Sequence, residues 1–176
     1  RGMYGLTAFT AKPDAGWPVV ILQHGITSNK NDMLAATGFL SMFGFATVAI
    51  DHPLHATRGF VSGEGETAKV INASSAVTGN DPTNYLNLSS LLTARDNLRQ
   101  SIADTLKLRL SLNGLVDATA AVDASGNLAD PSAIVRNIVD SSKVYYMGHS
   151  LGAITGASFT AIANSPVNPA LVADSD

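Results

Sequence analysis

Residues 148–152 have the sequence GHSLG, in which a serine lies between two glycines at the spacing G-x-S-x-G. The residues 144–147 before it form an apolar stretch typical of a buried strand, and residues 151–164 after it have the small side chains of a closely packed helix. A serine on a tight strand-to-helix turn projects its hydroxyl from the sheet, and its neighbours must be small because adjacent backbones crowd them. We therefore predict that Ser150 is a nucleophile. The residues that support its turn are Gly148, His149 and Gly152.

A second motif, His24-Gly25, follows the apolar run of residues 19–22. When a serine attacks an acyl carbon, negative charge develops on the carbonyl oxygen, and each backbone N–H aimed at that oxygen lowers the barrier by about 3 kcal/mol. In strand–turn–helix serine enzymes, one such donor follows the nucleophile and the other comes from a turn after an earlier strand. The sequence thus predicts the N–H groups of Leu151 and Ile26 as oxyanion donors.

The elements that must position these motifs follow a strand–helix–strand order. Residues 19–22 are a continuous apolar run, which suits a strand buried on both faces of a parallel sheet. Residues 33–43 carry apolar side chains at helical spacing and end at Gly44, and residues 45–50 form the next apolar strand. This order predicts an α/β fold, a mostly parallel sheet with flanking helices.

Residues 56–88 are predicted to be a long irregular connection, either a lid or binding loop at the site or a surface insertion. Residues 89–112 give the longest helical pattern, with a cap at Ser89 or Ser90. Its recurring positions are Leu91, Leu92, Arg95, Leu98, Ile102, Leu106 and Leu110. Shorter predicted elements are an edge strand at 4–10, a hairpin with its tip at 123–127, a helix at 131–139 and a strand beginning at 171–173.

The composition excludes several classes of function. The chain has 176 residues, of which 45% are hydrophobic and 14% charged, which predicts one globular domain. Its eleven Lys and Arg are scattered and its net charge is −3, so no nucleic-acid partner is expected. The absence of cysteine excludes disulfides, thiolate nucleophiles and cysteine metal sites. No leader is recognisable and no apolar run is long enough to span a membrane.

Together the motifs resemble the bacterial extracellular lipase and phospholipase A1-like group of α/β-hydrolases, which are exported or surface-exposed lipases of aquatic gammaproteobacteria. The resemblance covers most of residues 17–165, and the segment 87–100 is its most group-specific part. The segments that carry it are QHGIT at 23–27, IDHPLH at 50–55, NLSSLLTARDNLRQ at 87–100 and GHSLG at 148–152.

The resemblance implies hydrolysis of ester bonds to lipid acyl chains through Ser150, with Ile26 and Leu151 as oxyanion donors and His24 and Gly25 as the supporting motif. It implies no cofactor, a lipid or small ester as substrate, transient contact with a lipid surface, and a secreted or cell-surface location.

The catalytic base and acid depart from the family's pattern. In α/β-hydrolases the nucleophile is followed by the acid and then by the histidine. Here all four histidines precede Ser150, and the only later acids are Asp174 and Asp176. We therefore expect residues 1–176 to be the N-terminal portion of a single α/β-hydrolase catalytic domain, truncated after the elbow helix. The base, the acid and further strands would come from a C-terminal part, so that the strand at 144–148 lies mid-sheet.

Other roles for the histidines remain open. His52 and His55 follow a strand end and are alternative candidates for the base. His149 lies inside the turn, so its side chain is expected to point away from the nucleophile. Asp51, His52 and His55 also suggest metal ligands, but Pro53 forces a turn between the two histidines, and we predict no metal site.

Two further functions are compatible with the same motifs. A short-chain carboxylesterase or a peptidase of this fold would use the same nucleophile. A non-catalytic binding module would keep the strand–turn–helix geometry without using the serine.

Overall fold

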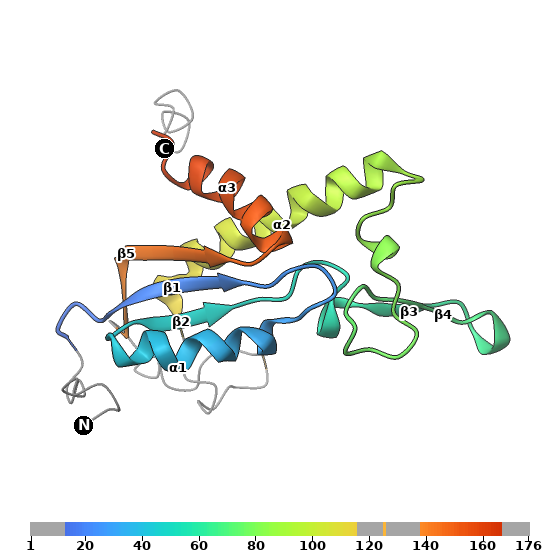
Figure 1. The fold of residues 1–176 in the computed structure, drawn as a ribbon. Coiled ribbons are helices and arrows are strands. Elements are labelled where there is room, and N and C mark those ends of the chain that lie inside the picture. Colours follow the sequence, from blue (N-terminus) through green and yellow to red (C-terminus); the bar gives the residue numbers. More distant parts are fainter. Residues whose placement is uncertain (1–12, 116–124, 126–137, 167–176) are drawn as a thin grey trace.

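The computed structural model describes residues 13–115, 125 and 138–166 and shows a mixed α/β fold around a parallel sheet (Figure 1). The sheet has the strand order β2-β1-β5. Strand β2 is Ala46–Ala49, β1 is Trp17–Gln23 and β5 is Val139–Gly148. Both neighbours pair with β1 in parallel, which confirms the predicted α/β class.

Strand β1 lies in the middle because it is apolar on both faces. Its side chains at residues 19–22 are at most 5% exposed, and burying each one contributes about 1.5–3 kcal/mol. Val19 packs in one core cluster with Leu112 and Val139. The carboxyl ends of the three parallel strands therefore meet at one edge of the sheet.

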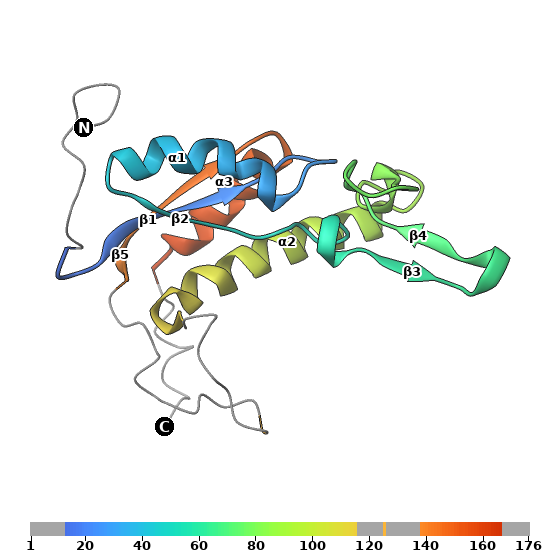
Figure 2. The ribbon, with the colours of Figure 1, turned by 90° about the horizontal axis from the view of Figure 1, so that it is seen from below.

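Helices cover both faces of this sheet (Figures 1 and 2). Helix α1, Leu34–Met42, follows a 3-10 turn at Lys30–Met33 and lies on one face. Helices α2, Leu91–Ser111, and α3, Leu151–Ala163, pack against each other on the opposite face. These three helices confirm the predicted helical segments to within a few residues. None of the helices described is long and apolar enough to cross a membrane.

The prediction of an irregular connection over residues 56–88 is wrong in part. Strands β3, Phe60–Ser62, and β4, Lys69–Ile71, form an antiparallel hairpin that projects beyond the sheet (Figure 2). Each strand has three residues, too few for an alternating pattern to be recognised in the sequence. Short 3-10 turns complete the segment at Ala56–Arg58, Gly65–Thr67 and Pro82–Asn84.

Helix α2 buries a different set of side chains from the predicted stripe. Its fully buried residues are Ala94, Ser101 and Thr105. The leucines at both ends of the predicted stripe are instead exposed, Leu91 by 69%, Leu92 by 65% and Leu110 by 73%. Ser101 faces inward to bond the buried His52 ring, whereas Thr105 donates to the Ser101 carbonyl within the helix. The middle of the predicted stripe, Leu98, Ile102 and Leu106, is half-buried. Ser90 is the N-cap residue, as predicted, but its side chain caps no helix N–H.

Strand β5 pairs only with β1 among the described strands, so it forms one edge of the sheet. Its Tyr145 and Met147 side chains are 52% and 44% exposed. The mid-sheet position expected for residues 144–148 is thus not met within the described part of the chain, and the further strands stay a prediction. Strand β5 begins at Val139, so the last residue of the helix predicted at 131–139 belongs to a strand instead. The rest of that helix, the strands at 4–10 and 171–173, the two late acids Asp174 and Asp176 and most of the hairpin tip at 123–127 lie outside the described residues.

Two glycines inside helices provide a matched test of this packing. A Cβ atom on Gly156 of α3 would lie 2.1 Å from Cε1 of Tyr146, whereas one on Gly38 of α1 would meet nothing within 4 Å. The Tyr146 ring is fixed by its hydrogen bond to the Gly152 carbonyl and by its contact with Phe159. We expect Gly156→Ala to lower the free energy of unfolding by about 1–3 kcal/mol and Gly38→Ala to raise it by about 0.5–1 kcal/mol. Urea unfolding measures both, and equal effects of the two changes would contradict the packing described.

Candidate active site

Ser150 lies in a strained turn between β5 and α3. Its backbone has φ 52° and ψ −116°, a conformation that is rare for a residue with a side chain and costs about 1–3 kcal/mol. The turn is held by the N–H of His149, which donates to the Gln23 carbonyl at 3.0 Å, and by the N–H of Gly152, which donates to the His149 carbonyl at 2.9 Å. Ser150 itself is exposed. The turn therefore presents this serine to solvent at the carboxyl edge of the sheet.

The glycines of the motif are required by close backbone contacts. A Cβ on Gly152 would lie 2.3 Å from the Gln23 carbonyl oxygen, and a Cβ on Gly148 would lie 2.4 Å from the carbonyl carbon of Gly152. Backbone atoms cannot move aside as a flexible side chain can. The spacing G-x-S-x-G thus follows from the contact of the turn with itself and with β1.

The His24-Gly25 motif lies directly against this turn. A Cβ on Gly25 would be 3.0 Å from Cβ of Ser150 and 3.1 Å from Nδ1 of His149. Two motifs more than a hundred residues apart in sequence are thus neighbours. The partly buried Ile26 packs against the cluster formed by Ala73, Tyr85 and Leu151.

The N–H groups of Ile26 and Leu151 are both without a hydrogen-bond acceptor among the described residues. For Leu151 this is expected, because the first N–H groups of a helix have no partner within the helix. The structure therefore brings together Ser150, the Gly25–Ile26 peptide and the N-terminus of α3, which are the groups that the sequence predicted to act together.

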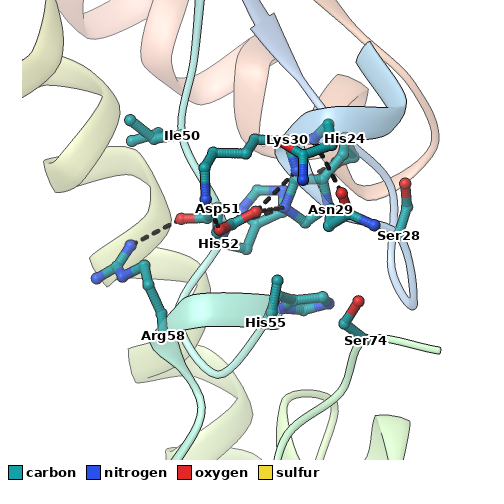
Figure 3. A network of polar contacts seen from close by, with 12 residues as sticks. His24, Ser28, Asn29, Lys30, Ile50, Asp51, His52, His55, Arg58 and Ser74 are labelled. Carbon is teal, nitrogen blue, oxygen red and sulfur yellow. Dashed lines mark hydrogen bonds and ion pairs between the residues drawn. The ribbon is translucent and has the colours of Figure 1, made fainter. Parts of the chain in front are cut away.

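Three buried histidines, in the segments that follow β1 and β2, lie close together (Figure 3). The rings of His24 and His52 are 4.7 Å apart, those of His24 and His55 are 5.1 Å apart, and those of His52 and His55 are 5.8 Å apart. Tyr85 closes the group, with its ring 5.2 Å from that of His55. None of the four histidines of the chain, the exposed His149 included, has a hydrogen bond to Ser150.

Hydrogen bonds define which ring nitrogen carries the proton. His24 Nε2 accepts from the backbone N–H of His52 at 3.0 Å, so its Nδ1 donates to the Gly25 carbonyl at 2.7 Å. His52 Nε2 donates to the His24 carbonyl at 3.0 Å, so its Nδ1 accepts from the Ser101 hydroxyl at 2.9 Å. His55 Nδ1 donates to the Pro53 carbonyl at 2.9 Å. His55 Nε2 and the Ser74 hydroxyl have no partner among the described residues, and Figure 3 shows the His55 ring directed toward Ser74.

Burial keeps these histidines neutral. It lowers the pKa of His52 to about 3, with the nearby His24 and His55 acting in the same direction. Burial likewise lowers the pKa of His24 and of His55 below the ordinary value, against hydrogen bonds to backbone carbonyls that raise it. A neutral imidazole can donate one hydrogen bond and accept another, and this is the pattern seen for His24 and His52.

An ion pair at the end of β2 ties the same region together. Lys30 Nζ contacts Asp51 Oδ2 at 2.5 Å, and the Lys30 N–H donates to Oδ1 at 2.7 Å (Figure 3). Thr57 donates to the same carboxylate. Burial, the largest influence, raises the pKa of Asp51, but the hydrogen bonds from Lys30 and Thr57 outweigh it and hold the pKa below the usual value.

The metal interpretation gains no support from this geometry. Both ring nitrogens of His52 have hydrogen-bond partners, and the carboxylate of Asp51 is paired with Lys30. Across the described ranges, no three or more His, Asp or Glu side chains are grouped as metal ligands would be.

The polar groups of this region were only partly found from the sequence. Lys30, Tyr85 and Ser101 were not singled out, because each is an ordinary residue in its local pattern. Ser101 and Thr105 stand four residues apart on one side of a helix, which is the one signal that could have indicated a buried polar side of α2.

Comparison with known proteins does not assign this site. No protein-family model and no curated protein matches the chain. The function must therefore be argued from the geometry of the residues themselves.

Removing the buried carboxylate tests the importance of the ion pair. Asp51 is 2% exposed, and Asp51→Ala leaves the Lys30 ammonium and two hydrogen-bond donors without their acceptor. We expect the free energy of unfolding to fall by about 3 kcal/mol. Asp96→Ala is the matched control, since the Arg95–Asp96 pair is exposed on α2, and it should leave stability nearly unchanged in urea unfolding. Similar losses for both variants would contradict the role given to Asp51.

The neutral histidines predict acid sensitivity. Their pKa values are lowered in the folded state, so below about pH 6.5 the unfolded chain takes up protons that the folded chain does not. Stability should fall with pH by about 1.4 kcal/mol per unit for each such histidine, and for His52 the loss continues to about pH 3. Asp51 does not contribute in this window, because its pKa is lowered and its stabilisation is lost only below about pH 4. Urea unfolding from pH 7.5 to 5 should show this slope of stability against pH. In His55→Phe the slope should be smaller by the contribution of one histidine. A flat profile would show that the histidines are not buried and neutral.

Proposed function

We propose that this chain carries the nucleophile and the oxyanion hole of a serine ester hydrolase with the α/β-hydrolase fold. The observation that supports this proposal best is the positive φ of Ser150 at a strand-to-helix turn. The Cβ of Ser150 also lies against Gly25. Such strain is stored where function requires a side chain to be held in one position. The unpaired N–H of Ile26 adds to this support, since it lies in the turn that packs against the exposed serine.

The reaction follows from these groups. Ser150 Oγ attacks the acyl carbon of the ester while its proton passes to a general base, and the carbonyl oxygen becomes an oxyanion. The N–H groups of Ile26 and Leu151 donate to that oxyanion, aided by the positive end of the α3 dipole. The C–O bond to the alcohol then breaks, the alkoxide takes the proton from the base, and the acyl group remains on Ser150. Water attacks this acyl-enzyme by the same route and releases the carboxylic acid.

The base and its acid are expected from residues other than those described, as the family resemblance implies. His52 is not supported as the base, because both its ring nitrogens are engaged. His55 has a free Nε2, but its side chain is fully buried behind Tyr85. The described residues thus account for attack and charge stabilisation, and proton transfer requires a further group.

A lipid acyl ester is the substrate class that we propose, for a secreted or cell-surface protein. Three exposed leucines at and just before the start of α2 support it, since Leu88 is 81%, Leu91 69% and Leu92 65% exposed. Exposed apolar side chains grouped in this way are typical of surfaces that contact lipid or another apolar partner. A short-chain carboxylesterase, a peptidase or a non-catalytic binding module would share the elbow and are separated from a lipase by experiment.

A fluorophosphonate probe tests the nucleophile directly. We expect the full-length protein to be labelled at Ser150, and Ser150→Ala to abolish both labelling and ester hydrolysis, because the proposed mechanism uses this hydroxyl as its nucleophile. Ser158→Ala is the matched control, an exposed serine of α3 that should keep full labelling. Intact mass spectrometry with peptide mapping measures the adduct. A folded wild-type protein without label would identify a binding module instead.

Nitrophenyl esters of increasing acyl length test the substrate class. For a lipase we expect kcat/KM to rise from the acetyl to the decanoyl ester by about tenfold or more, because each buried methylene adds up to about 0.8 kcal/mol of binding. A preference for acetyl or butyryl esters would favour the carboxylesterase, and cleavage of an aminopeptidase substrate instead of esters would favour the peptidase.

A further inference from the structure

We propose that His52 is a positioning residue for the oxyanion hole, and that it holds the Ile26 N–H in place through His24. The inference rests on the proposed function. It assigns a role to a buried side chain that was first considered as a base or a metal ligand and that the geometry supports as neither.

The peptide between Gly25 and Ile26 is the unit that must be oriented. In a planar trans peptide the C=O and the N–H point in opposite directions, so fixing one fixes the other. The Gly25 carbonyl accepts from His24 Nδ1 at 2.7 Å. This bond directs the carbonyl toward the His24 ring and hence directs the Ile26 N–H away from that ring.

His52 holds His24 by two hydrogen bonds, and it is the donor in both. The backbone N–H of His52 donates to His24 Nε2 at 3.0 Å, which leaves the proton of His24 on Nδ1, where the Gly25 carbonyl needs it. The side-chain Nε2–H of His52 donates to the His24 carbonyl at 3.0 Å. This bond fixes the peptide between His24 and Gly25, which precedes the Gly25–Ile26 peptide. These two histidines therefore orient both peptides of the turn before Ile26, together with the Ser28 N–H, which donates to the Gly25 carbonyl at 3.3 Å.

Two hydroxyl groups fix the His52 ring in turn. Because Nε2 must donate to a carbonyl, Nδ1 is an acceptor and Ser101 must donate to it. The Ser101 oxygen then accepts from the Tyr85 hydroxyl at 2.6 Å. The Tyr85 hydroxyl also donates to the Asn97 carbonyl at 3.2 Å, so its hydrogen is shared between two acceptors. The hydrogens of Ser101 and of His52 Nε2 each have one acceptor, and the chain runs from Tyr85 through Ser101 and His52 to the His24 carbonyl. All members are buried, so water does not compete for these bonds.

The same chain contacts the second oxyanion donor. The Tyr85 ring packs in one cluster with Leu151, the first residue of α3, and with Ile26. The residue that ends the hydrogen-bond chain therefore belongs to the apolar cluster that also contains Leu151 and contacts Ile26. A shift at His52 is expected to change the distance between these two N–H groups and the reacting oxygen.

Steady-state kinetics of the full-length protein on a nitrophenyl ester test the inference. We expect His52→Phe and Ser101→Ala to lower kcat by about 10-fold to 100-fold, with KM changed by less than about threefold. A misplaced N–H donor weakens the hydrogen bond to the oxyanion of the transition state more than it weakens substrate binding. His52→Gln can donate to the His24 carbonyl and accept from Ser101, so it should recover kcat to within about tenfold of wild type. Ser111→Ala, an exposed serine at the end of α2, is the control and should not change kcat.

The outcomes separate the two proposals. If wild type hydrolyses the ester through Ser150 but His52→Phe and Ser101→Ala keep kcat within about twofold, or change KM alone, the positioning role is wrong and the proposed function stands. If wild type neither hydrolyses esters nor reacts with a fluorophosphonate, the proposed function fails and this inference with it.

A second measurement does not depend on how the variants fold. Long-range ¹H–¹⁵N spectra of the wild-type imidazoles report which ring nitrogen carries the proton. We expect the Nε2–H form for His52 and the Nδ1–H form for His24, with the His52 form unchanged from pH 8 to about pH 5. The opposite tautomer at either histidine, or rapid exchange between the two, would overturn the proposal even if the variants cannot be purified.

Discussion

At the carboxyl end of β1, the backbone of Gln23 and His24 lies so close to Gly152 that no side chain fits between them. This contact depends on β1 being a buried central strand, and it determines where α3 begins. The turn between β5 and α3 must then be tight, and Ser150 takes a positive φ as a result. The position of the exposed hydroxyl group therefore follows from backbone packing and not from any interaction of its own side chain.

Burying the strand ends places polar groups in the interior, and most of these groups bond to one another, His55 Nε2 and the Ser74 hydroxyl being exceptions. The histidines at 24, 52 and 55 are neutral and hydrogen-bonded, and the Lys30–Asp51 pair joins the loop after β1 to the end of β2. Helix α2 contributes Ser101 to this region, so its buried side includes polar groups, while Leu91, Leu92 and Leu110 at its two ends are exposed. A buried polar network of this kind stabilises one arrangement of the turn, since each unpaired member would cost about 1–3 kcal/mol.

The main elements were predictable from the sequence because their signals are local. The apolar run at 19–22, the glycine that ends the helix at Gly44 and the G-x-S-x-G spacing each depend on neighbouring residues only. The contact between Gly25 and Ser150 was inferred from the order of motifs along the chain. The chain of hydrogen bonds from Tyr85 to His24 could not be predicted, because it joins residues 16 to 49 positions apart whose types are common everywhere. The three-residue strands of the hairpin were missed for lack of a detectable period.

A crystal structure of the fluorophosphonate adduct tests the central claim most directly. The account predicts a covalent bond from Ser150 Oγ to phosphorus, with the phosphonyl oxygen about 2.7–3.1 Å from the N–H groups of both Ile26 and Leu151. It also predicts that the His24 and Gly25 peptides keep their orientation in the adduct. A phosphonyl oxygen directed to solvent, or an adduct on another residue, would contradict the assignment of this turn as an oxyanion hole.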